Sequence, residues 1–285
     1  MVRRHAGSVF TILAILATIV LMQGCSLADS AGVSSSDDSV SQAQYDSKSG
    51  VYSSQGVDVV KESEENSDNK KPAEMKKIYL TFDDGPSPYT QRILDILDEY
   101  DVKATFFVQG KTGDYASSAY KRIVEDGHTL GMHTFSHKYN EIYASKENFI
   151  ADVEKLQEYL YEETGVWSRL YRFPGGSSNK VSKVPIEELI KYLDDQGIRY
   201  FDWNISSDDA SKGGLSKERI IQNVMNPIDK YDECVILMHD ALEKKTTVEA
   251  LEEIIPKLLA RGDCLLLPIT DETDLIQHIK DKNIE

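Results

Sequence analysis

The chain of 285 residues has a formal net charge of −16 at pH 7, and 40% of its residues are hydrophobic. A domain that binds nucleic acid needs a basic surface, so this acidic balance excludes that class and we expect no nucleic-acid partner. The length suits one large α/β domain or two smaller ones, and the three cysteines (Cys25, Cys234 and Cys264) are too few for a disulfide-stapled fold.

The first residues have the organisation of an export signal. Arg3–His5 carries positive charge, and Val9–Met22 is an uncharged, mostly apolar run that ends at Gly24 and Cys25. The run is short for a membrane span, which takes roughly 20 residues. A cysteine in this place resembles the processing site of bacterial lipoproteins, so we predict a signal peptide over residues 1–24 and a lipid anchor at Cys25 on the outer face of the cell membrane. A plain signal peptide and an uncleaved anchor are the alternatives, and all three place the rest of the chain outside the cytoplasm.

A serine-rich segment follows the export signal. Between Ser26 and about Lys71 there are 13 serines, scattered acidic residues and few large apolar side chains. Such a segment cannot bury enough apolar surface to offset the entropy of an ordered chain. We therefore predict a disordered linker over residues 25–75, and a flexible chain of roughly 50 residues has a typical end-to-end distance of about 40 Å.

Strand-like and helix-like segments alternate from residue 76 to the end of the chain. The expected strands are short runs rich in apolar, β-branched and aromatic residues: Ile78–Phe82, Ala104–Val108, Thr129–Met132, Leu170–Phe173, Arg199–Trp203, Cys234–Met238 and Cys264–Leu267. The expected helices have apolar residues at helical spacing: Gln91–Tyr100, Tyr115–Asp126, Lys146–Glu163, Val184–Asp195, Lys217–Lys230 and Val248–Ala260. This alternation predicts a parallel sheet, and the strand number over about 210 residues favours one domain, residues 76–285, folded as a distorted (β/α)7-type barrel. An open, doubly wound sheet is the alternative, because periodicity does not show whether a sheet closes.

Polar residues stand at the carboxyl ends of the expected strands. They are Asp83 and Asp84 after the first strand, His133 and His137 after the third, Arg172 at the end of the fourth, Asp202 and Trp203 at the end of the fifth, and His239 and Asp240 after the sixth. Enzymes built on α/β barrels form their active sites on this face. The sequence thus predicts one site that gathers all of these groups.

Two adjacent carboxylates and two histidines have the chemistry of a metal site. Neighbouring side chains of an extended segment point to opposite sides, so Asp83 and Asp84 should do different work. One can bind a metal while the other faces a substrate or a water. His133 and His137 can bind the same cation if the segment between them turns, and two imidazoles, one carboxylate and an open position form a catalytic zinc arrangement.

The segments together resemble the motifs of the polysaccharide deacetylases of carbohydrate esterase family 4, from about residue 76 to the C-terminus. As they stand here, the motifs are Thr81-Phe82-Asp83-Asp84-Gly85-Pro86, His133-x-x-x-His137, Arg172-x-Pro174, Asp202-Trp203 and Leu237-x-His239. The family folds as a distorted barrel of parallel strands, which agrees with the expected elements.

The resemblance implies which residues hold the metal and activate water. Asp84, His133 and His137 would bind a divalent metal, usually Zn2+. Asp83 would be the general base that takes a proton from the attacking water, and Arg172 would orient Asp83. A divalent metal lowers the pKa of a bound water towards about 7, which makes a nucleophile available at neutral pH.

The resemblance also implies an acid and a pocket. His239 would be the general acid that protonates the departing amine, adjusted by Asp202, and Trp203 and Leu237 would line the pocket for the acetyl methyl group. The family often has Tyr at the fifth position of the third motif, where this chain has Gly176. We therefore expect the Gly176 backbone N–H to remain available to the oxyanion while the groove on this side is more open.

The predicted activity is removal of N-acetyl groups from an extracellular or cell-wall polysaccharide, with release of acetate. Peptidoglycan is the leading acetylated substrate, because the linker would keep the domain near it, and chitin-type oligomers come next. An O-acetyl esterase acting on xylan-like glycan would use the same machinery and stays open. Outside the enzymes, an inactive deacetylase scaffold could serve as a sugar-binding lipoprotein, or the protein could be a surface adhesin. The retained motif residues favour an enzyme, which we expect to be a monomer.

The remaining histidines and cysteines have weaker assignments. His128 is expected to be structural or solvent-facing, and His278 is expected to lie in a last helix without a function. Cys234 and Cys264 open two strands that we expect to be neighbours, so they either form a disulfide or pack as small apolar groups. Four aromatic residues either stack on sugar rings or pack inside the protein: Tyr139, Tyr143, Trp167 and Tyr171.

Overall fold

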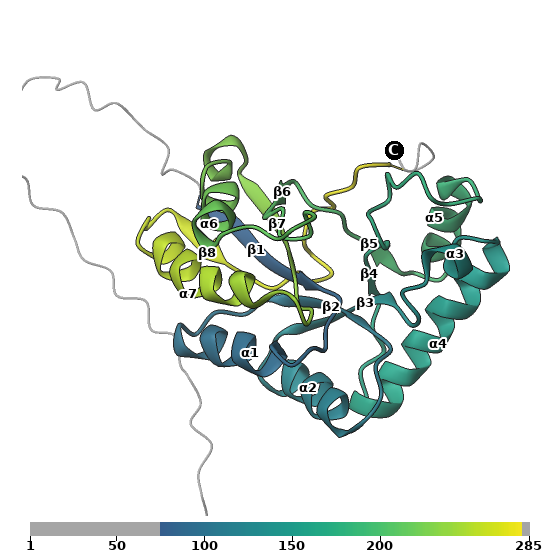
Figure 1. Ribbon diagram of the computed structural model, residues 1–285. Helices are drawn as coiled ribbons and strands as arrows, with labels where there is room; N and C mark the ends of the chain where they lie inside the picture. Colours follow the sequence, from purple (N-terminus) through teal and green to yellow (C-terminus); the bar gives the residue numbers. More distant parts are fainter. Residues whose placement is uncertain (1–74, 281–285) are drawn as a thin grey trace, which may run out of the picture. The chain divides into compact units, whose positions relative to one another are not determined.

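The computed structural model describes residues 75–280 (Figure 1). The predicted signal peptide, the lipid anchor at Cys25 and the predicted linker before Met75 lie outside the described residues. Within residues 75–280, no helix is both long enough and apolar enough to cross a membrane.

All strands of the described residues pair in parallel in one sheet. Their bounds are β1 (Lys76–Asp83), β2 (Thr105–Gln109), β3 (Thr129–Thr134), β4 (Leu170–Tyr171), β5 (Arg199–Tyr200), β6 (Ile205–Ser206), β7 (Glu233–His239) and β8 (Cys264–Leu266). Their order is β5-β4-β3-β2-β1-β7-β6, with β8 paired to β1 outside this path. The expected distorted barrel of parallel strands is confirmed.

Strand β1 pairs with three neighbours. Along its length it pairs with β7, from Lys77 opposite Glu233 to Asp83 opposite His239. On its other edge, β8 pairs with the first residues of β1 and β2 pairs with the last ones. Because the strands are parallel and in register, Asp83 and His239 reach the carboxyl edge of the sheet side by side.

The barrel is interrupted between β5 and β6, the two ends of the strand order. The expected strands Leu170–Phe173 and Arg199–Trp203 are too long, because β4 and β5 have only two residues each, and β6 was not expected. Beyond β5 the backbone pairs with the end of the chain, where the Asp202 N–H donates to the Ile276 carbonyl over 2.7 Å. The C-terminal segment thus satisfies backbone groups that the short strands leave unpaired.

The helices lie around the outside of the sheet (Figure 1). Their bounds are α1 (Thr90–Glu99), α2 (Asp114–Glu125), α3 (Tyr139–Ile142), α4 (Lys146–Thr164), α5 (Ile186–Asp195), α6 (Lys217–Met225) and α7 (Lys245–Leu259). The short α3 was not expected, and the expected helix Lys217–Lys230 is divided into α6 and a 3₁₀ turn, η1 (Ile228–Lys230). Pro227 explains the break, since proline has no N–H to continue the helical hydrogen bonds.

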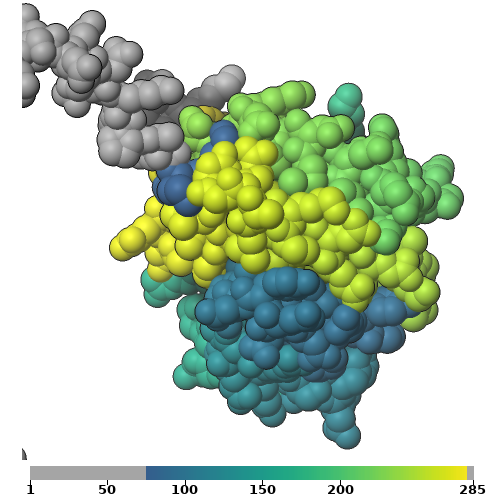
Figure 2. All heavy atoms as spheres, turned by 90° about the vertical axis from the view of Figure 1, so that its left-hand side faces the viewer, coloured from purple at the N-terminus to yellow at the C-terminus, as the bar shows by residue number. Residues whose placement is uncertain are grey.

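Helix α4 shows how the local sequence directs packing. It begins after Ser145, whose hydroxyl accepts a hydrogen bond from the N–H of the third helical residue. Phe149, Val153 and Leu156 recur at helical spacing and are completely buried in the core. On another side of the molecule, α7 packs between α1 and α6, as Figure 2 shows.

Residues with weaker assignments have structural roles. The two described cysteines are free thiols: Cys234 lies opposite Ile78 and Cys264 opposite Lys76, so β1 separates the two strands. The disulfide alternative is therefore wrong, and both side chains pack in the core. His128 is buried and its Nδ1 accepts a main-chain N–H over 3.1 Å. Burial lowers the pKa of His128 to about 4, which keeps this structural histidine neutral.

Candidate active site

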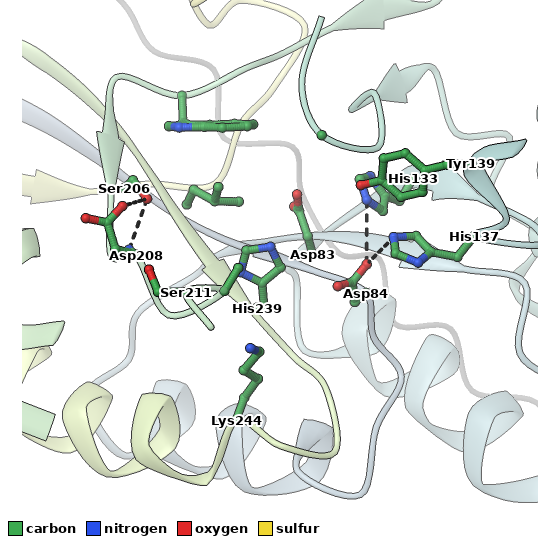
Figure 3. A pocket seen from close by; sticks show the side chains of 14 residues that line it. Asp83, Asp84, His133, His137, Tyr139, Ser206, Asp208, Ser211, His239 and Lys244 are labelled. Carbon is green, nitrogen blue, oxygen red and sulfur yellow. Dashed lines mark hydrogen bonds and ion pairs between the residues drawn. The ribbon is translucent and has the colours of Figure 1, made fainter. Parts of the chain in front are cut away.

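A cavity of about 530 Å³ opens at the carboxyl edge of the sheet (Figure 3). Strand ends and the loops after them supply its lining: Asp83, Asp84, His133, His137, Tyr139, Gly175, Trp203, Ser206, Asp208, Ala210, Ser211, Leu237, His239 and Lys244. Of the predicted site residues, Arg172, Asp202 and Gly176 are not part of this lining.

The two adjacent carboxylates point in different directions (Figure 3). Asp83 is the last residue of β1 and is 3% exposed. Asp84 leaves the strand with a φ of 78°, a left-handed conformation that is uncommon outside glycine. Its N–H still donates to the Phe107 carbonyl of β2 over 3.2 Å. This turn directs Asp84 toward the two histidines while Asp83 faces Arg172.

Asp84, His133 and His137 form a cluster whose ligand atoms all lie within 4.8 Å of one another. Asp84 Oδ1 lies 3.1 Å from His137 Nε2 and 3.6 Å from His133 Nε2. His133 Nδ1 lies 2.7 Å from the Arg172 carbonyl. Because a carbonyl only accepts, Nδ1 carries the proton and Nε2 presents its lone pair to the cluster. The Gln109 side chain orients the carboxylate by donating to Asp84 Oδ1 over 2.8 Å.

The protonation states of the cluster fit a metal site. Burial lowers the pKa of His133, which favours the neutral imidazole that binds metals. Burial would raise the pKa of Asp84, but the hydrogen bond from His137 and the electrostatic pull of the imidazoles outweigh it and hold that pKa well below its usual range. Two imidazoles and one carboxylate beside an open cavity match the donor set of a catalytic zinc ion.

A carboxylate outside the motifs holds the loop between the two histidines. Asp152 of α4 accepts hydrogen bonds from the Thr134 hydroxyl (2.7 Å), the Phe135 N–H (2.8 Å), and the N–H and hydroxyl of Ser136 (3.1 and 2.9 Å). The His137 N–H donates to the Thr134 hydroxyl over 3.1 Å, and His137 has a φ of 54°. Asp152 therefore stabilises the strained turn that presents His137 to the cluster.

Replacing Asp152 with Asn should weaken zinc binding by about tenfold. The amide has one acceptor oxygen for donors that two carboxylate oxygens now share, and outer partners of metal ligands are typically worth about 10–100-fold in affinity. Competition with a chromogenic chelator measures the zinc affinity. The control is Asp195→Asn, at an exposed α5 carboxylate bonded to Lys191, which should leave the affinity unchanged. Equal zinc affinity in Asp152→Asn and the natural protein would show that the turn does not depend on this carboxylate.

Arg172 is completely buried behind Asp83. Its Nη1 donates to Asp83 Oδ1 over 2.9 Å and to the Thr81 hydroxyl over 2.6 Å. Its Nε and Nη2 donate to the carbonyls of Phe201 (3.0 Å) and Asp202 (2.8 Å). A guanidinium bound on all of these sides has one orientation, and it holds the Asp83 carboxylate in place.

The carboxylate that contacts His239 is Asp209, not Asp202 as predicted. Asp209 Oδ1 lies 2.6 Å from His239 Nδ1, and Oδ2 accepts from the His239 N–H (2.9 Å) and the Thr247 hydroxyl (2.9 Å). Burial alone would lower the pKa of His239, but the hydrogen bond and negative charge of Asp209 outweigh it and raise the pKa above its usual value. With Nδ1 occupied by Asp209, Nε2 is the nitrogen left for a ligand.

Asp202 instead fastens the loop after β4 to the C-terminal segment. Its buried carboxylate accepts from the N–H and hydroxyl of Ser177 (2.8 and 2.5 Å) and from the His278 N–H (2.7 Å). His278 is in an irregular segment rather than the expected helix, and its ring packs edge-on against Trp203 with centroids 4.9 Å apart. The prediction that Asp202 adjusts His239 is wrong, because the Asp202 carboxylate is bonded to Ser177 and His278. The chain first runs through β6, and Asp209 after β6 is the carboxylate that contacts His239.

The glycine of the third motif that lines the cavity is Gly175, and not Gly176 as predicted. Gly175 lines the cavity with a φ of 78°, and its N–H has no hydrogen-bond acceptor among residues 75–280. The Gly176 N–H is occupied, since it donates to the Phe173 carbonyl over 2.8 Å. A Cβ at Gly176 would lie 3.0 Å from the Trp203 ring, so a side chain there would meet protein rather than the groove.

Aromatic and apolar side chains complete the cavity. Trp203 and Leu237 line it, and their role toward an acetyl group stays a prediction. Tyr139 also lines it, and burial raises the pKa of Tyr139 to about 12, so its hydroxyl keeps its proton at neutral pH. The other aromatic candidates are not in the lining of this cavity: Tyr143, Trp167 and Tyr171.

Sequence reasoning missed Asp209, Asp152 and Lys244. Asp209 lies in a Ser-Ser-Asp-Asp run, a composition typical of surface turns, and β6 before it is too short to give a strand pattern. Asp152 lies on helix α4. An acidic residue on a helix usually belongs to the face that is exposed to solvent, so the sequence provided no reason to place Asp152 near the site. The adjacent pair of carboxylates at residues 208–209 is the one signal that could have indicated the partner of His239.

Comparison with known proteins gives the family. Residues 70–200 match the family model for polysaccharide deacetylase. A peptidoglycan-N-acetylglucosamine deacetylase of Bacillus cereus is 31% identical over 194 residues, which are 67% of this chain and 66% of that protein. A second one from Bacillus cereus is 32% identical over 195 residues, 67% of this chain and 85% of that protein.

A solved structure agrees with these relatives. The catalytic domain of the peptidoglycan N-acetylglucosamine deacetylase from Eubacterium rectale matches with a TM-score of 0.69 and 41% identity, covering 73% of this chain and 94% of that one. The chain belongs to the polysaccharide deacetylases of carbohydrate esterase family 4. It spans 66% of the length of the first relative above, slightly less than two thirds.

Proposed function

We propose that this protein is a zinc-dependent hydrolase that removes N-acetyl groups from an extracytoplasmic polysaccharide and releases acetate. The observation that carries the proposal is the composition of one cavity. It holds a metal-binding cluster around Asp84, a carboxylate fixed by Arg172, and a histidine whose Nδ1 is bonded to a carboxylate. Amide hydrolysis needs a Lewis acid, a general base and a general acid, and the cluster, the carboxylate and the histidine would supply them in that order.

Asp83 is the base in this proposal. When bound, the divalent metal lowers the pKa of water and polarises a carbonyl. Arg172 holds the Asp83 carboxylate next to the metal cluster, where it takes the proton of the water that attacks the acetyl carbonyl. A positioned general base typically contributes about 10²–10⁴-fold in rate.

His239 is the acid, and Gly175 assists the oxyanion. An amide nitrogen leaves only as a protonated amine, so the tetrahedral intermediate returns to the starting amide unless a proton reaches the nitrogen. Asp209 raises the pKa of His239, which keeps a proton available for this step. The Gly175 N–H, free of protein acceptors among the described residues, donates to the oxygen that becomes negative.

Peptidoglycan is the substrate that we propose. Three of the proteins compared above carry the name peptidoglycan N-acetylglucosamine deacetylase, at 31% to 41% identity to this chain. A lipid anchor at Cys25, followed by the predicted linker, would hold the domain within reach of the cell wall. The same residues could serve O-acetyl esters, and the experiment below separates the two reactions.

Mass spectrometry of defined glycans after incubation tests the proposed function. Peptidoglycan fragments should lose acetyl groups, a chelator should abolish the loss, and added Zn2+ should restore it. Chitin oligomers and acetylated xylan serve as competing substrates. Deacetylation of xylan alone would make the protein an O-acetyl esterase, and no acetate from any glycan would make it a sugar-binding scaffold.

A further inference from the structure

A second cavity, of about 340 Å³, lies at the amino edge of the sheet, on the opposite edge from the active site. Thr129 and Leu170, the first residues of β3 and β4, both line it. Strand β3 continues from Thr129 to the metal cluster, where His133 stands four residues further on, roughly 13 Å along the strand. The residues of β3 between the two sites are buried. A ligand bound in one cavity therefore does not reach the other.

Trp167 gives the second cavity an aromatic wall that solvent can reach. It stands between α4 and β4 and is 48% exposed, an unusual position for so large an aromatic side chain. Tyr161 of α4 packs edge-on against it, with ring centroids 5.6 Å apart, and is itself 51% exposed. Aromatic side chains that stay exposed beside a cavity indicate a place where a ligand packs.

Two buried polar atoms in the lining residues have no hydrogen-bond partner among residues 75–280. They are Nε2 of His128 and the hydroxyl of Ser168, in residues that are 6% and 3% exposed. Because His128 Nδ1 accepts the Ala104 N–H, Nε2 carries the proton and is a donor without an acceptor. Buried polar groups of proteins are almost always hydrogen-bonded, so a polar molecule is expected at these two atoms.

The lining favours a small, uncharged ligand. Arg169 and Asp271 stand exposed in it with opposite charges, and neither side chain forms an ion pair within the described part of the chain. Burial lowers the pKa of His128 to about 4, so this side chain adds no charge. The volume lies at the lower end of the range for small-molecule sites, about 300–1,000 Å³. A pyranose ring fits these conditions, because its C–H groups form an apolar face and its hydroxyl groups stand around the edge.

We propose that the second cavity binds a neutral sugar ring of a glycan, with the ring face on Trp167 and the ring hydroxyls bonded to His128 and Ser168. This goes beyond the proposed function, because the residues of the metal cluster are not in this lining and the cavity binds without cleaving. The bound ring belongs to another strand than the one in the active site, or to a distant part of the same polymer. The cavity therefore raises affinity for a polymer and leaves the turnover of a short oligomer unchanged.

Depletion of the zinc-loaded full chain from solution by a series of insoluble chitin concentrations measures the affinity for a neutral polymer. Trp167→Ala should bind chitin about tenfold more weakly, because it removes the aromatic face, and Ser168→Ala about threefold more weakly, because it removes one hydrogen bond. Both should match the natural protein in kcat/KM on a soluble tetramer of N-acetylglucosamine. The control is Tyr115→Ala, at an α2 aromatic that is 53% exposed and outside this lining, which should change neither quantity.

Several results would overturn the inference. Unchanged chitin affinity in Trp167→Ala, or no binding of chitin by the natural protein, would mean that the cavity holds no sugar ring. A loss in Trp167→Ala without any loss in Ser168→Ala would mean that an exposed tryptophan adsorbs to chitin without using the cavity. An equal loss of tetramer kcat/KM would mean that the substitution acts on the active site. If no glycan is deacetylated, the proposed function fails, and the affinities for chitin still decide whether the second cavity binds sugar.

Discussion

The Asp83→Asn variant should keep its zinc and its affinity for glycan while kcat falls by about 10²–10⁴-fold. Asparagine has the shape of aspartate and can still accept the hydrogen bond that Arg172 donates over 2.9 Å, but it cannot take a proton from water. The loss should therefore fall on the chemical step. Elemental analysis for zinc, calorimetry for glycan and acetate release for turnover measure the three quantities separately.

The matched variant is Asp84→Asn, one residue further along the chain. Asp84 belongs to the metal cluster, within 3.1 Å of His137, so this change should weaken zinc binding first and lower turnover as a consequence. Excess zinc should restore part of the activity of Asp84→Asn and none of that of Asp83→Asn. If Asp83→Asn turned over glycan near the natural rate with zinc bound, Asp83 would not be the base.

The Asp209→Asn variant should move the alkaline limb of the pH–rate profile to lower pH. A general acid works only in its protonated form, and Asp209 raises the pKa of His239, so activity in the natural protein extends to higher pH. Asparagine removes the negative charge, and the pKa of His239 falls. At a pH above this lowered pKa the rate should fall with the protonated fraction, toward the full loss of a general acid, about 10²–10⁴-fold.

The pH dependence of kcat/KM, measured from roughly pH 6 to pH 10, shows the position of this limb. Asp208→Asn is the control, because its carboxylate is bonded to Ser206 rather than to His239, and its alkaline limb should stay in place. An alkaline limb that does not move in Asp209→Asn would show that His239 is not the group that titrates.

The sequence by itself predicted the fold class, which the structure confirms, and it predicted the residues of the cluster formed by Asp84, His133 and His137, because both predictions depend on local pattern. Strand β1 is a run of mostly buried residues that ends at Asp83, with Asp84 directly after it. Neighbouring side chains of an extended segment point to opposite sides, which already separated Asp83 from Asp84. His133 and His137 are only four residues apart, so the sequence could bring them together, while the turn that presents His137 also depends on Asp152 of α4.

Only the tertiary structure decided which carboxylate serves His239 and which glycine lines the groove. Asp202 and Asp209 are both acidic and both precede β7, and the difference between them is set by β6, a two-residue strand with no pattern of its own. In the same way Gly175 and Gly176 differ only in where their N–H groups point, which depends on the turn after β4. The positions of these residues depend on irregular backbone, whose hydrogen bonds join segments that are far apart in the chain. One example is the hydrogen bond from the His278 N–H to the Asp202 carboxylate. Local sequence propensity does not encode such long-range contacts.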